Sequence, residues 1–127
     1  MRILVIEDDP QTIELLVRVL EDDGHDVAGE RTGTAGLARA IASKWDLIIC
    51  DIGLPDMNGN TLSRQLRRAG IDVPLLALSG YATDEDRTLG LASGFDQYLA
   101  KPIDPAAVVR AVVAMWNAAK PGRRPCE

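Results

Sequence analysis

The sequence predicts an α/β fold in which five parallel strands form one doubly wound sheet flanked by five helices. Two observations support this prediction. Five short apolar runs recur along the 127 residues, and each is followed by a longer segment with helical spacing. Three of these runs are continuous rather than alternating, as expected for parallel strands buried on both faces. Strand–helix alternation repeated five times is typical of a parallel sheet covered by helices on both sides.

We expect the strands at the apolar runs. The three continuous runs lie at residues 3–6, 47–50 and 73–78. Residues 27–28 and 98–99 form shorter runs of mixed polarity, so we expect these two to be edge strands. Because crossovers between parallel strands are right-handed, the pattern favours the flavodoxin-like strand order 2-1-3-4-5.

The first three helices are predicted from their apolar spacing and from glycine stops. The first has a stripe at i, i+3, i+4 and i+7, formed by Ile13, Leu16, Val17 and Leu20. Gly24 ends this helix. The second helix runs over about 34–41. In the third, Leu62 and Leu66 face inward, the arginines face outward and Gly70 is the stop.

The last two helices have signals at their ends. The fourth covers roughly 83–93, is more polar, and stops at Gly94. The fifth begins at Asp104 and Pro105, an N-cap acid followed by proline at the first helical position, and continues to about Ala118. Its expected inward stripe consists of Val108, Val109, Val112 and Met115.

Composition excludes several classes of protein. A net charge of −5 disfavours direct binding of nucleic acid, whose phosphates require a basic stripe. No apolar run approaches the roughly 20 residues that span a bilayer. Two cysteines, Cys50 and Cys126, do not make a disulfide framework, and the first residues do not resemble a signal peptide. These features predict a soluble, cytoplasmic protein.

Polar side chains follow four of the five predicted strands. They are Glu7, Asp8 and Asp9 after the first, then Asp51, Ser79 and Lys101 after the third, fourth and fifth. In such sheets ligands bind beyond the carboxyl ends of the strands. Two carboxylates about 4 Å apart repel by roughly 4 kcal/mol at an effective dielectric constant near 20. Lys101 offsets part of that repulsion, and Mg²⁺, which prefers carboxylate oxygens, would offset more.

A carboxylate, a divalent cation, a lysine and a hydroxyl are suited to phosphoryl transfer. The transition state of that reaction spreads charge over three oxygens, which the protein positions and neutralises. Here the metal, the Lys101 ammonium and the Ser79 hydroxyl each provide a partner. Asp51 would be the nucleophile and would form an acyl phosphate.

Four segments at these strand ends carry a resemblance to a known family. They are ILVIEDD at 3–9, DIGLPDMNG at 51–59, LSG at 78–80 and YLAKP at 98–102. Their order and placement resemble response-regulator receiver domains of two-component systems, of the chemotaxis-regulator kind. The resemblance covers about residues 2–118. It implies a receiver domain over 1–119, which leaves 120–127 as a flexible tail.

The resemblance implies specific roles for these residues. Asp51 would accept a phosphoryl group from the phosphohistidine of a sensor histidine kinase or a histidine phosphotransfer protein. Mg²⁺ or Mn²⁺ would be held by Asp8, Asp51 and the Gly53 backbone carbonyl, and through water by Glu7.

Further roles follow from the last two segments of the resemblance. Ser79 and Lys101 would contact the phosphoryl group. Tyr98 would be the aromatic switch that turns inward, and the bond between Lys101 and Pro102 would be cis, which the tertiary amide before proline makes accessible. Asp9 is interpreted either as part of the acidic cluster or, preferably, as the cap of the first helix.

Three functional classes are compatible with such a site. The favoured one is a phosphorylation-activated signalling switch that catalyses only its own phosphotransfer and dephosphorylation. A phosphorylation-independent interaction module is the alternative. A phosphatase of the haloacid dehalogenase kind is disfavoured because position 53 is glycine where that family needs a second acid. We hypothesise that the fourth helix, fifth strand and fifth helix form the partner or homodimer surface, whether the chain is a stand-alone regulator or part of a longer protein.

Overall fold

The computed structural model describes residues 1–80 and 83–119, so the predicted tail at 120–127 lies outside the described residues. The five strands are β1 Arg2–Ile6, β2 Asp26–Glu30, β3 Leu47–Asp51, β4 Leu75–Ser79 and β5 Gln97–Ala100. The five helices are α1 Pro10–Asp22, α2 Gly33–Ala42, α3 Gly59–Arg68, α4 Asp84–Ala92 and α5 Pro105–Ala118. All neighbouring strands are parallel in the order β2-β1-β3-β4-β5, so the predicted fold and both predicted edge strands are confirmed.

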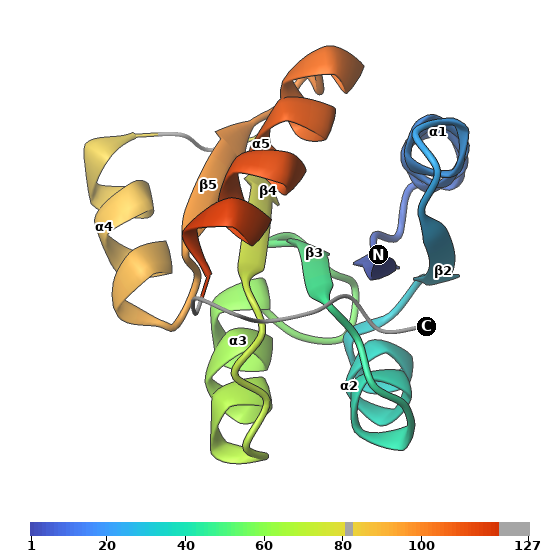
Figure 1. The fold of residues 1–127 in the computed structure, drawn as a ribbon. Coiled ribbons are helices and arrows are strands. Elements are labelled where there is room, and N and C mark those ends of the chain that lie inside the picture. The colour runs from blue at the N-terminus through green and yellow to red at the C-terminus, as the bar shows by residue number, and fades with distance from the viewer. Residues whose placement is uncertain (81–82, 120–127) are drawn as a thin grey trace.

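The sheet separates two hydrophobic cores. Helices α1 and α5 cover one face, and α2 and α3 cover the other, with α4 lying beside β5 (Figure 1). Alternate residues of one strand point to opposite faces. Leu4 and Ile6 of β1 therefore pack with α2 and α3, whereas Ile3 and Val5 pack with α1 and α5. Within the part of the chain that is described, no helix is both long enough and apolar enough to cross a membrane.

Two strands differ from the prediction by more than one residue at an end. β4 begins at Leu75 rather than at residue 73. Pro74 has no N–H to donate, although its carbonyl accepts from Ile48 N at 3.0 Å. β2 is longer than residues 27–28 because backbone pairing with β1 continues through polar Asp26 and Glu30. Composition alone does not mark these two residues as strand.

One predicted side-chain orientation on the helices is wrong, and another is met only in part. Arg67 of α3 does not point to solvent with its neighbours. Its guanidinium donates to the carbonyls of Gly94 and Val73 and pairs with Asp96 Oδ2 at 2.9 Å, which joins α3 to the turns beside β4 and β5. Val109 of α5 is only half-buried, whereas the rest of its predicted stripe is buried.

The turn after β3 is closed by a tight contact at the start of α3. The Asn58 side chain caps this helix, and Gly59 N donates to Ile52 O at 2.8 Å. A Cβ at position 59 would lie 2.6 Å from the Asp51 carbonyl oxygen and 2.7 Å from Ile52 Cα. Only glycine fits here without moving the backbone that follows Asp51.

Gly59→Ala is therefore expected to destabilise the protein by about 2–4 kcal/mol, because the clash is with backbone atoms. Urea unfolding monitored by circular dichroism measures the change. Gly53→Ala, in the same turn, is the matched control because a Cβ there meets no atom within 4 Å. An equal loss of stability in both variants would contradict this explanation.

Candidate functional site

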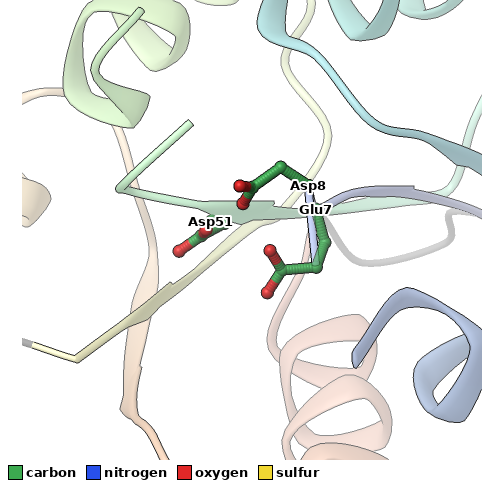
Figure 2. Close-up of side chains that lie close together, drawn as sticks. All are labelled: Glu7, Asp8 and Asp51. Carbon is green, nitrogen blue, oxygen red and sulfur yellow. The ribbon is translucent and has the colours of Figure 1, made fainter. Parts of the chain in front are cut away.

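Three carboxylates converge at the carboxyl ends of β1 and β3. Ile6 and Cys50 are register partners in these neighbouring strands, so the residues that follow them, Glu7 and Asp51, lie side by side. Figure 2 shows their side chains together with that of Asp8. One oxygen from each of the three lies within 4.8 Å of the others. Glu7 is fully buried and Asp51 is 4% exposed, so this acidic cluster is not a solvated turn.

Lys101 neutralises part of the buried charge. Its Nζ lies 2.7 Å from Glu7 Oε1 and 3.2 Å from Asp51 Oδ1. The lysine reaches the cluster from the end of β5, two strands away from β3 in the sheet. Its backbone N–H donates to Ser79 O at 2.8 Å, and its bond to Pro102 is cis, as predicted.

Burial and charge shift the titration of this pair. Burial raises the pKa of Glu7 to about 7; the Lys101 hydrogen bond opposes this change and Asp51 adds to it. Burial alone would lower the pKa of Lys101, but its contacts with Glu7 and Asp51 outweigh burial and leave that pKa raised. Without a further cation, one positive charge therefore faces more negative charge than it can balance.

We predict that Glu7 makes the stability of the metal-free protein fall as pH rises. A carboxyl whose pKa is raised on folding binds its proton more tightly in the folded state, so its stabilising contribution is full below pH 4.5 and is lost by about pH 7. Glu7→Gln removes this titration. The variant should be more stable than wild type at pH 8, by on the order of 1–3 kcal/mol.

Urea unfolding in metal-free buffer at pH 5, 6, 7 and 8 tests this prediction. The difference between wild type and Glu7→Gln isolates Glu7 from the other titrating groups. Curves that stay parallel across this range would contradict the assignment of the pH dependence to Glu7.

The remaining predicted site residues occupy the neighbouring strands. Ser79 ends β4 and is 2% exposed. Tyr98 of β5 is 5% exposed, with the Arg87 guanidinium 5.5 Å from its ring centroid. The structure thus holds the predicted switch aromatic in a buried position. The Asp9 carboxylate accepts from Thr12 N at 2.9 Å and caps α1, which confirms the capping interpretation, while the Asp9 N–H donates to Glu7 Oε2 at 3.2 Å.

The loop after β3 brings a backbone N–H group to the acids. Gly53 N donates to Asp51 Oδ1 at 3.3 Å, and Gly53 forms an isolated antiparallel bridge with Asn58. The three converging carboxylates offer the hard oxygen ligands that Mg²⁺ prefers. The unbalanced buried charge is a second reason why these residues fit a divalent cation.

Two residues near the site were not predicted from the sequence. Arg31, directly after β2, donates from Nε and Nη2 to the Asp8 carbonyl at 3.2 and 3.0 Å. Asp56, in the loop after β3, accepts from the start of α2. Neither residue received a role from the sequence, although Asp56 lies within the segment 51–59 that carries the family resemblance, because each role depends on contacts between segments more than twenty residues apart.

Comparison with known proteins agrees with this geometry. The family of the response regulator receiver domain matches residues 3–113. An uncharacterized 14.6 kDa protein of Leptolyngbya boryana is 39% identical over 88% of this chain and 87% of its own length. The probable transcriptional regulatory protein SilR of Salmonella typhimurium is 43% identical over 80% of this chain. This chain spans only 45% of SilR.

A solved structure extends the likeness to the whole fold. The CheY-like receiver domain protein of Methanospirillum hungatei matches with a TM-score of 0.87 and 28% identity, over 92% of this chain and 94% of that protein. The likeness to a chemotaxis-type receiver that the sequence suggested is therefore found in three dimensions.

Proposed function

Because this chain belongs to the response regulator receiver family, we propose that it is a phosphorylation-activated signalling switch with Asp51 as its phosphoacceptor. The observation that carries the proposal is the contact of Lys101 with both Glu7 and Asp51 inside a buried acidic cluster. Receiver domains are signalling modules that bind Mg²⁺, and the acids here suit that ion. We assign the receiver to residues 1–119.

The proposed reaction moves one phosphoryl group onto Asp51. A carboxylate oxygen of Asp51 attacks phosphorus, the bond from phosphorus to the imidazole nitrogen of the donor breaks, and that nitrogen keeps the electron pair. Lys101 Nζ lies 3.2 Å from Asp51 Oδ1 and would neutralise an oxygen of the transferred group. The Ser79 hydroxyl, at the end of the next strand, would bind a second oxygen.

We propose two kinds of metal ligand at this site, direct and water-mediated. Asp8, Asp51 and the Gly53 carbonyl would bind Mg²⁺ or Mn²⁺ directly, and Glu7 would do so through water. When bound, the ion supplies charge neutralisation of the phosphoryl oxygens. Glu7 is better suited to a water-mediated role than to catalysis because Lys101 Nζ already lies 2.7 Å from its Oε1.

The experiment that tests this function is intact-mass measurement of the whole chain after incubation with acetyl phosphate. We expect a labile gain of one phosphoryl group with Mg²⁺ and none with a chelator. If acetyl phosphate gives no adduct, a phosphohistidine donor is used next. No adduct from either donor would overturn the switch and favour the phosphorylation-independent interaction module.

We propose that a sensor histidine kinase or a histidine phosphotransfer protein donates the phosphoryl group, and that this transfer takes place in the cytoplasm.

We also propose that α4, β5 and α5 form the output or homodimer surface. Among the described residues, three of the five large exposed apolar side chains support this surface: Leu89, Leu91 and Val113. Exposed Ala114 also lies beside a hollow of about 440 Å³.

Ala114→Arg is expected to abolish phosphorylation-dependent association in analytical ultracentrifugation, whereas Ile41→Arg on α2 should not. Association of Ala114→Arg at the wild-type level would contradict the assignment of this surface.

A further inference from the structure

The carboxylate of Asp56 joins the loop after β3 to the start of α2. Its Oδ1 accepts from Gly33 N at 2.8 Å. Its Oδ2 accepts from both Thr34 N at 2.8 Å and Thr34 Oγ1 at 2.7 Å. The Thr34 hydroxyl and these backbone N–H groups lower the pKa of Asp56 to about 2, so the group stays ionised.

This contact completes the capping of α2 from a distant segment. The helix's own N-cap, Thr32, accepts from Ala35 N at 3.1 Å and does not serve the first two residues of the helix. Asp56 accepts from the N–H groups of those two residues, which would otherwise lack partners within the helix. The next residue, Met57, packs so closely on Gly33 that a Cβ there would lie 2.5 Å from its Cγ.

The helix that receives Asp56 is itself fixed to the sheet beneath the acidic cluster. Gly36 of α2 packs against Ile6 of β1 so closely that a Cβ would lie 2.5 Å from Ile6 Cδ1. Ile6 directly precedes Glu7. Helix α2, which holds Asp56, therefore packs against the end of β1, and Glu7 and Asp8 directly follow that end.

The loop that Asp56 fastens carries the Gly53 carbonyl. Its ends are fixed by Ile52 N, which donates to Leu78 O at 2.9 Å, and by the close contact at Gly59. Between them Leu54 is buried in the core, but Gly53 has no side chain to hold it in place. Within the described structure, the Asp56 carboxylate is the charged group that connects this loop to another element, the start of α2.

We propose that Asp56 is a positioning residue for the metal site, which sets the position of the loop carbonyl before the cation binds. The inference rests on the proposed function, because it assumes that this carbonyl is a ligand. Mg²⁺ demands near-ideal octahedral geometry and tolerates a displaced ligand poorly. Groups that orient metal ligands typically change affinity by about 10–100-fold when removed.

Isothermal titration of Mg²⁺ into the full chain tests the proposal. Asp56→Ala is expected to weaken Mg²⁺ binding about tenfold, and Asp56→Asn, which keeps one acceptor oxygen, to restore part of the loss. In phosphorylation by acetyl phosphate, the Mg²⁺ concentration for half-maximal rate should rise while the rate at saturating Mg²⁺ stays unchanged. If Asp56 served stability alone, its removal would not raise the half-maximal Mg²⁺ concentration while leaving the rate at saturating Mg²⁺ unchanged.

Asp86→Ala is the matched control, because Asp86 likewise accepts from a threonine hydroxyl at a helix start, Thr83 Oγ1 at 2.7 Å on α4. It should lower stability without changing Mg²⁺ affinity. Mg²⁺ affinity in folded Asp56→Ala within twofold of wild type would overturn the inference while leaving the proposed function intact. Absence of Mg²⁺ binding by wild type would overturn both.

Discussion

Asp51→Asn is expected to abolish the phosphoryl adduct that acetyl phosphate and Mg²⁺ form on the wild-type protein. An amide cannot supply the anionic oxygen that attacks phosphorus, whereas its size and shape match those of the carboxylate. The buried position of Asp51 makes the conservative change informative, since a smaller residue would leave a cavity beside Glu7. Intact mass under mild conditions, with the donor in excess, measures the loss.

The control for Asp51→Asn is Asp22→Asn, which changes the same functional group at an exposed position near the end of α1. Its adduct should form at the wild-type rate. A labile adduct that persists in Asp51→Asn would contradict the assignment of the acceptor and would direct attention to Asp8, the neighbouring acid.

Lys101→Met is expected to slow phosphorylation by about 10²–10³-fold, the usual cost of removing one group that stabilises transition-state charge in a buried site. Methionine keeps most of the apolar stem and removes the ammonium that lies 2.7 Å from Glu7 Oε1 and 3.2 Å from Asp51 Oδ1. The initial rate at saturating Mg²⁺ separates this effect from any change in metal affinity.

Lys44→Met is the matched control, because Lys44 is exposed at the opposite end of β3. The Lys44→Met variant should become phosphorylated at the wild-type rate. A rate for Lys101→Met within threefold of wild type, in protein that is shown to be folded, would mean that the ammonium serves the stability of the metal-free cluster rather than the reaction.

The fold could be predicted because its signals are local. Continuous apolar runs identified β1, β3 and β4, and Asp104 before Pro105 marked the start of α5. The convergence of Glu7, Asp51 and Lys101 also followed from the sequence, since the carboxyl ends of parallel strands meet at one edge. The predicted parallel direction and order of the strands were sufficient to bring these residues together.

Long-range polar contacts could not be predicted in the same way. Arg67 looked like a solvated helix residue because its carbonyl partners, at Gly94 and Val73, have no side-chain signature. Asp56 lay in a segment of the family resemblance but received no role of its own, because its partners at the start of α2 precede it by more than twenty residues. In both cases a charged group satisfies backbone atoms of another segment, and only the assembled fold identifies them.

Borohydride reduction can show whether Asp51 forms an acyl phosphate. Borohydride reduces the acyl phosphate carbonyl to an alcohol and releases phosphate, so a phosphorylated aspartate is converted to homoserine. After treatment with acetyl phosphate and Mg²⁺, reduction and digestion, we expect peptide mass spectrometry to find homoserine at position 51 and at no other acid. Homoserine at another aspartate, or at none in protein that carries the adduct, would contradict the assignment of Asp51 as the phosphoacceptor.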